Sequence, residues 1–156
     1  MKKLELLIRY ILLNYPLINE LSKPRLVKII YLIDWKYAID YGKQYTEINW
    51  FFNHYGPYVD DVIKLMKEKP SVFKVNSNIN SLGGVTDRFF LIDNTPVYID
   101  NDIKNVADYI ISNTYKLNWS EFINLVYSSY PIKNNLKYSN LDLNKLSSEF
   151  RELKKQ

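Results

Sequence analysis

One very apolar segment, with polar residues at only a few places, most constrains how this chain can fold. Ser22 can cap a helix and Pro24 fits its first turn, while Gly42 can end it in a left-handed conformation about five turns later. The apolar residues between them leave almost no polar face, and they include Leu26, Ile29, Ile30, Leu32 and Ile33. Such a helix is buried on several sides. The sequence therefore predicts a central helix over residues 23–41.

The segments on either side of this helix predict one more helix, a strand and a turn. Apolar residues at helical spacing indicate a first helix that ends near Pro16. Residues 48–54 alternate with a period of two, which predicts a strand with Ile48, Trp50 and Phe52 on its core face. We expect Tyr55-Gly56-Pro57 to turn the chain directly into a helix ending near Lys69, because proline presets a first helical turn and glycine allows unusual backbone angles.

The second half predicts a hairpin and three helices. Residues 72–76 and 88–92 favour strands, and the polar, glycine-bearing segment between them predicts a long flexible loop. Helix starts are indicated at Asp100, at Asn118 with Glu121 three residues later, and at Asp142; we expect Tyr130-Pro131 to end the second helix. The last helix should carry an apolar stripe of Leu143, Leu146, Phe150 and Leu153. The predicted fold is mainly α with a small antiparallel β element (α+β), as one compact multi-helix domain over residues 1–156.

Composition supports a globular protein in the cytoplasm. A chain of 156 residues with 47% hydrophobic content can bury a real core, and it lacks the cysteines of a disulfide framework or a thiolate metal site. The N-terminus imitates a signal peptide, but Glu5 and Arg9 interrupt its apolar run and no small-residue cleavage site follows. No apolar run is long enough to cross a membrane. We expect a cytoplasmic protein with no membrane contact.

Charge gives little support to nucleic-acid binding. The net charge of +4 is concentrated in residues 1–28, and a basic end could meet nucleic acid or an acidic partner. However, the basic residues are scattered, and no helix-turn-helix with a basic recognition helix can be identified. Ordinary solvated charge is the favoured interpretation.

The residues of a catalytic site are also scarce. A zinc site would need the single histidine, His54, together with carboxylates, an uncommon set. No serine lies in a GxSxG motif, and Gly83-Gly84 lacks the spacing of a phosphate-binding loop. We therefore predict no catalytic residue, no metal and no cofactor.

Asp34 is the sharpest single residue, because a carboxylate in so apolar a helix needs partners. It could be an acid or base working with His54, or a structural group bonded to a tyrosine hydroxyl, a tryptophan indole or a Lys or Arg side chain. The structural interpretation is favoured, since an enzyme would need more polar company. Lys28 is likewise expected at the helix surface or in a buried pair before it is expected to contact a ligand.

The central helix and the turn after it also carry a family resemblance. The matching residues are Lys23, Arg25, Leu26, Lys28, Tyr31, Leu32, Asp34 and Trp35, followed by Tyr55, Gly56 and Pro57. In this order they resemble the Panacea domain, and we expect the similarity to cover about residues 5–150. Members of this family are SocA-like antitoxins of bacterial and phage toxin–antitoxin pairs. The resemblance implies a largely helical fold with a small sheet, and protein binding rather than catalysis; most of the motif residues are expected to be structural.

The expected function is accordingly that of an antitoxin. The resemblance implies a module that neutralises a cognate toxin, encoded by an adjacent gene, by covering the toxin or by acting as an adaptor for a protease or chaperone. The alternatives are a nucleic-acid-binding or regulatory prophage protein, and a hydrolase using His54 and Asp34. Phe51 and Tyr58, on the face around the Gly-Pro turn, are the predicted partner contacts; a strand buried on both faces is the competing interpretation for Phe51.

Overall fold

The computed structural model describes residues 2–156 and confirms a mainly helical α+β fold. Its helices are α1 (Lys2–Asn14), the 3₁₀ turn η1 (Ile18–Glu20), α2 (Lys23–Tyr41), α3 (Asp61–Glu68), α4 (Asn101–Thr114), α5 (Trp119–Tyr127), α6 (Tyr130–Lys133) and α7 (Leu143–Lys154). Its strands are β1 (Trp50–Asn53), β2 (Gly56–Pro57), β3 (Phe73–Ile79), β4 (Val85–Leu91) and β5 (Asn140–Leu141).

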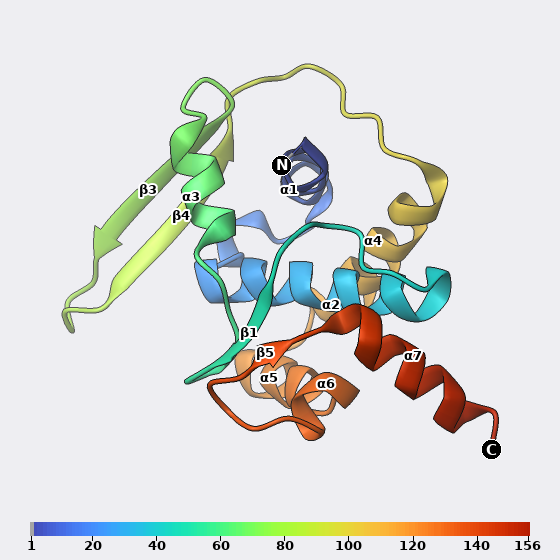
Figure 1. The fold of residues 1–156 in the computed structure, drawn as a ribbon. Coiled ribbons are helices and arrows are strands. Elements are labelled where there is room, and N and C mark those ends of the chain that lie inside the picture. Colours follow the sequence, from blue (N-terminus) through green and yellow to red (C-terminus); the bar gives the residue numbers. More distant parts are fainter. Residues whose placement is uncertain (1) are drawn as a thin grey trace.

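Helix α2 lies at the centre, with α1 on one side and the pair α5 and α6 on the other (Figure 1). Its bounds are those predicted from the sequence: the Ser22 side chain accepts a hydrogen bond from the amide of Arg25, and Gly42 ends the helix with φ 86°. The apolar residues of α2 are almost all buried, while α4 and α7 pack along it. The prediction of a central apolar helix is confirmed.

The turn after β1 differs from the prediction. Gly56 has the expected positive φ, 105°, but Pro57 continues an extended backbone in β2, and α3 begins only at Asp61. The cause is pairing with β1, in which Phe52 lies opposite Pro57 and the amide of Tyr58 donates to the carbonyl of Phe51 over 3.0 Å. This pairing keeps the chain extended, so the expectation that Pro57 starts a helix was wrong.

A third short strand completes this sheet, in the order β2-β1-β5. Strand β5 was not predicted, because two residues are too few to show a periodicity. Trp50 lies opposite Leu141, and the amide of Phe52 donates to the carbonyl of Ser139 over 2.9 Å. The C-terminal part of the chain therefore returns to the strand beside the Gly-Pro turn.

The predicted hairpin is present, with longer strands and a shorter loop than expected. Strands β3 and β4 pair from Phe73 opposite Leu91 to Ile79 opposite Val85. The Asn80 side chain holds the tip by accepting hydrogen bonds from two loop amides. The hairpin projects from the helical body in Figure 1, and its tip exposes Ile79, Leu82 and Val85.

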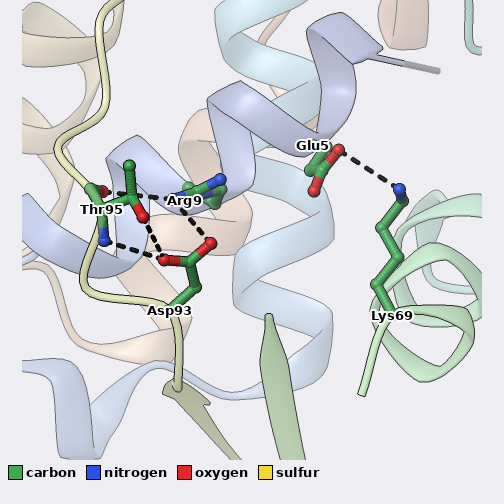
Figure 2. A network of polar contacts seen from close by, with 5 residues as sticks. All are labelled: Glu5, Arg9, Lys69, Asp93 and Thr95. Carbon is green, nitrogen blue, oxygen red and sulfur yellow. Dashed lines mark hydrogen bonds and ion pairs between the residues drawn. The ribbon is translucent and has the colours of Figure 1, made fainter. Parts of the chain in front are cut away.

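Charged residues of α1 attach this helix to the segments just before and just after the β3–β4 hairpin, as Figure 2 shows. Glu5 meets Lys69, which follows α3, at 3.4 Å. Arg9 donates to the carbonyl of Thr95 over 3.2 Å and pairs with Asp93 at 3.5 Å, beyond the end of β4. The two residues that interrupt the apolar run of α1 therefore fix the base of the hairpin. No helix within residues 2–156 is long and apolar enough to span a membrane.

The predicted helix caps are partly confirmed. Asn118 and Glu121 form a complete capping box, and the Asp142 side chain accepts from the amide of Lys145. Asp100 occupies the N-cap position of α4, but its side chain makes no capping hydrogen bond. Pro131 does not simply end α5; it lies in the first turn of the short helix α6. On α7 the predicted stripe is incomplete, because Leu153 is exposed.

Candidate functional site

Asp34 is a fully buried carboxylate whose two oxygens are both occupied by donors from the segment after α2. Oδ1 accepts hydrogen bonds from the amides of Tyr45 (3.2 Å) and Thr46 (2.9 Å). Oδ2 accepts from the Thr46 hydroxyl and, at 2.8 Å, from the Trp50 indole. Burial raises the pKa of the Asp34 carboxyl, and the hydrogen bonds oppose that rise. This arrangement clamps the chain between α2 and β1, which suits the structural interpretation.

Three other motif residues connect α2 to the helices around it. The Arg25 guanidinium donates to the carbonyls of Thr114 (3.2 Å) and Leu117 (2.7 Å), at the end of α4. The Tyr31 hydroxyl bonds the Ser129 hydroxyl at 2.8 Å. The indole of Trp35 contacts the rings of Tyr130 and Phe150. These side chains have internal partners, so a structural role explains why these residue types occur here.

Lys28 is different, because it is buried without a partner. Its exposed fraction is 2%, yet within residues 2–156 no hydrogen bond or ion pair reaches its ammonium group. Burial lowers the pKa of Lys28 to about 8. The structure thus corrects one expectation, since Lys28 is neither a surface residue nor half of a buried pair.

The Gly-Pro turn packs directly on the stem of this lysine. A Cβ atom placed on Gly56 would lie 3.5 Å from Cε of Lys28 and 3.5 Å from the Tyr127 ring. With φ at 105°, the position is also strained for any residue with a side chain. The glycine of the motif therefore allows β2 to lie close against the lysine of the motif.

The end of Lys28 opens into two adjoining hollows that share Pro24, Lys28 and Tyr55. One has a volume of about 300 Å³ and is completed by Lys23, Asn53, His54 and Tyr58. The other has a volume of about 360 Å³ and is completed by Trp119, Ile123 and Tyr127. We call the residues of both hollows together the Lys28 cleft.

The rim of the Lys28 cleft is aromatic, and its charge is positive. Tyr55 is 73% exposed and Trp119 44% exposed, so large apolar surfaces stand free beside the Lys28 ammonium, which reaches solvent only at the cleft. The ammonium of Lys23 lies 5.9 Å from the ring centre of Tyr58. Neither hollow is lined by an Asp or Glu among the described residues. The cleft can hold an anionic group next to an apolar one.

The two predicted partner contacts have different positions. Tyr58 lines the Lys28 cleft. Phe51 does not; it is half-buried, on the same face of β1 as Asn53, because alternate residues of a strand share a face. Its neighbours Ile48, Trp50 and Phe52 are buried, as predicted.

The hydrolase alternative receives no geometric support. His54 is exposed beside the turn, and its Nδ1 bonds the Tyr138 hydroxyl at 2.9 Å. Asp34 has a separate set of partners on β1 and the preceding loop. No hydrogen bond joins the two residues in the described chain, and no group of three or more metal-ligating side chains occurs in residues 2–156.

The sequence reasoning missed the α5 side of the cleft. Trp119, Ile123 and Tyr127 lie four residues apart and so share one face of α5. This spacing could have drawn attention to them, but the face it would meet was not predictable. A larger polar hollow of about 670 Å³ lies between the loop at 43–50 and residues 140–144; Thr46 and Trp50 of the Asp34 clamp line it, but Asp34 does not.

One comparison with known proteins gives a match. A family model described as "Antitoxin SocA-like, Panacea domain" matches residues 26–131, a shorter span than the expected 5–150. The match includes Lys28, Asp34, the Gly-Pro turn and all of α5, and it begins just after Lys23 and Arg25. Neither the curated proteins nor the solved structures compared with this chain include a match.

Proposed function

The chain belongs to the family of SocA-like antitoxins with a Panacea domain, and on this premise we propose that it neutralises a cognate toxin by binding it directly. The family implies a toxin protein as the kind of partner, and it suggests a role without catalysis. We further propose that the toxin is the product of an adjacent gene and that the complex forms in the cytoplasm.

The observation that carries the proposal is the Lys28 cleft, because it combines a buried cation with free aromatic surface in one place. Interfaces are enriched in aromatic side chains, and a few of them supply most of the binding energy. Tyr55, Tyr58 and Trp119 offer such side chains around the two hollows of the cleft. Most of the remaining motif residues have internal partners, so the cleft is the part of the motif region that is open to another molecule.

The contact surface must extend beyond the cleft itself. A stable interface buries about 1,200 Å² or more in total, which is more than two small hollows can supply. The outer face of β1, with the half-buried Phe51, is next to Asn53 in the cleft and would add to it. Phe51 therefore remains a predicted contact at the edge of the surface, with Tyr58 nearer its centre.

Co-expression tests this function. Alone, the protein should be harmless to growth; with the adjacent gene it should restore growth and be recovered with the toxin in a pull-down. Trp119→Ala and Tyr58→Ala should each weaken the complex about tenfold or more without unfolding the domain. Tyr98→Ala is the matched control, since Tyr98 is 83% exposed and does not line the cleft. Failure of both growth rescue and pull-down with every adjacent gene product would contradict the proposal.

The mode of neutralisation can be separated in the same strains. If the chain acts by covering the toxin, a purified mixture of the two proteins should lose toxin activity with no protease present. If it acts as an adaptor, the cellular lifetime of the toxin should shorten when the chain is present. We propose occlusion, because a cleft with a rim of large side chains is suited to lasting contact.

A further inference from the structure

Lys28 stands apart from the other buried charged side chains of this protein. Arg25 donates to two carbonyls and Asp34 accepts from four donors, whereas the Lys28 ammonium has no partner among the described residues. Burying a charge is costly unless it is paired. Methionine or leucine would fill the same space without this cost, so stability does not account for a lysine here.

The missing partner can reach Lys28 only from outside, through the two hollows that the side chain lines. The groups facing it are Lys23 on α2, His54, Tyr55 and Tyr58 around β2, and Tyr127 on α5. No carboxylate is among them. With a pKa of about 8, the amine is still mostly protonated at pH 7. A cation whose stem is buried and whose end lies in a largely apolar cleft gains most from an anion that enters that cleft.

The surroundings favour a carboxylate over a polyanion. The ammonium lies among aromatic and aliphatic side chains, and only Lys23 adds a second positive charge. The hollow next to the cleft, which shares Lys23 and Tyr58 with it, is lined by the carboxylates of Asp60 and Glu68 as well as by Lys64 and Lys67. A nucleic-acid backbone needs several cations in an unbroken path, and here two carboxylates stand among the lysines, whereas a single carboxylate needs only the Lys28 ammonium.

We propose that the Lys28 cleft captures an acidic side chain of the partner protein, with the carboxylate against the Lys28 ammonium and a neighbouring aromatic or aliphatic side chain on Tyr55 and Trp119. This inference rests on the proposed function and names the chemistry of the toxin segment that the cleft recognises. The bond formed is a charge-assisted hydrogen bond from Nζ to a carboxylate oxygen.

A small probe tests the cleft without the toxin. The full-length protein is titrated with N-acetyl-aspartyl-phenylalaninamide, and the backbone amide signals of residues 54, 55 and 119, which every variant keeps, are followed by NMR. Saturable binding is expected with a dissociation constant of about a millimolar. The asparaginyl analogue, which lacks only the charge, should bind about tenfold more weakly or worse.

Two variants tie the result to the cleft. Lys28→Met should abolish the preference for the aspartyl probe, and Trp119→Ala should weaken both probes while Tyr98→Ala changes neither. Melting curves confirm that each variant is folded. Equal binding of the two probes, equal binding of acetate alone, or tighter binding of an oligothymidine at the same signals would overturn the inference; the last would favour nucleic acid.

A second test uses the complex with the adjacent gene product. Lys28→Met should weaken that complex at least tenfold, and neutralising one acidic residue of the toxin should have no further effect in the Lys28→Met background. If the complex is unchanged by Lys28→Met, the inference fails while the proposed function stands. If the aspartyl probe binds but no gene product forms a complex, the proposed function fails while the acidic-segment site stands.

Discussion

Two charged side chains in the two halves of α2, Lys28 and Asp34, differ in how many internal partners they have. Asp34, toward the C-terminal end, is fully occupied by four donors from residues 45, 46 and 50 of the same chain. Lys28, six positions earlier, has a buried stem, and its ammonium has no internal partner within residues 2–156. Both belong to the same motif. Burial of a motif residue therefore does not tell its role; the number of its internal partners does.

The difference has a topological origin. The chain leaves α2 and passes directly over Asp34 on its way to β1, so local backbone amides reach the carboxylate. Lys28 instead faces the place where β2 and α5 approach each other, and Gly56 leaves room for the lysine stem. One end is closed by the fold, and the other is left open.

The largest expected effect on the free energy of unfolding is at Asp34, in the half of α2 that the fold closes. Asp34→Ala leaves the Thr46 hydroxyl, the Trp50 indole and two amides without their acceptor, so the free energy of unfolding should fall by about 3–5 kcal/mol in urea melts. Asp40→Ala, which breaks a surface ion pair on the same helix, should change it by less than about 1 kcal/mol. Equal losses of unfolding free energy for Asp34→Ala and Asp40→Ala would show that the hydrogen bonds to Asp34 do not stabilise the fold. If folded, Asp34→Asn should still bind the partner.

The opposite sign is expected at Lys28. Lys28→Met should raise the free energy of unfolding at pH 7 by about 1–3 kcal/mol, because it removes an unpaired buried cation. Between about pH 8, its pKa in the fold, and 10.5, its ordinary value, the folded state binds fewer protons than the unfolded chain. The wild type therefore gains stability as the pH rises through this window.

The advantage of the methionine variant should accordingly be full below pH 8 and shrink toward pH 10.5. Paired urea melts of the variant and the wild type at pH 7 and pH 10 measure this difference. A variant less stable than the wild type at pH 7 would mean that Lys28 has an internal function in the fold.

A smaller loss of stability is expected when only one of the hydrogen bonds to Asp34 is removed. Trp50→Phe removes the 2.8 Å hydrogen bond to Oδ2 but keeps an aromatic ring beside Tyr31. It should cost about 1–2 kcal/mol more than Trp35→Phe, since the indole of Trp35 makes no hydrogen bond in the described chain. Chemical denaturation of both variants gives the comparison. No difference would assign the role of Trp50 to packing alone.

The smallest effect on stability is expected at the rim. Tyr55 is 73% exposed, so Tyr55→Ala should change the free energy of unfolding by less than about 0.5 kcal/mol. Its expected effect is on binding, where loss of an aromatic rim contact should weaken the toxin complex several-fold. Thermal melting and a binding titration on the same preparation separate the two. A large loss of stability would move Tyr55 into the structural group.

The elements that the sequence predicted well are those fixed by local chemistry. Ser22 and Gly42 define α2, and Asn118 with Glu121 defines the start of α5, because caps act over a few neighbouring residues. The errors concern pairings between strands, whether near or distant in sequence. Pro57 is held extended by β1, and β5 meets β1 from almost ninety positions away; neither pairing leaves a periodic signal.

The candidate site was predictable only in part for the same reason. The sequence singled out Lys28 and Tyr55 as motif residues and Tyr58 as a partner contact, but not that they line one cleft with Trp119 and Tyr127. Spacing along α5 identifies a helix face without identifying what that face meets. The absence of a partner at Lys28 is a property of the tertiary structure. The sequence could therefore suggest a buried lysine, but not that its ammonium faces a cleft without an internal partner.

The C-terminal segment returns to β1, so the part of the chain that matches the family is shorter than the part that must fold together. The family match ends at residue 131, yet β5 pairs with Trp50 and α7 places Phe150 against Trp35, both inside the matched span. A chain cut at that boundary would leave one edge of β1 unpaired and one face of α2 bare. We infer that residues 2–156 fold as one domain. Gene fusions that join a different tail after residue 131 must therefore bring a replacement strand and helix with them.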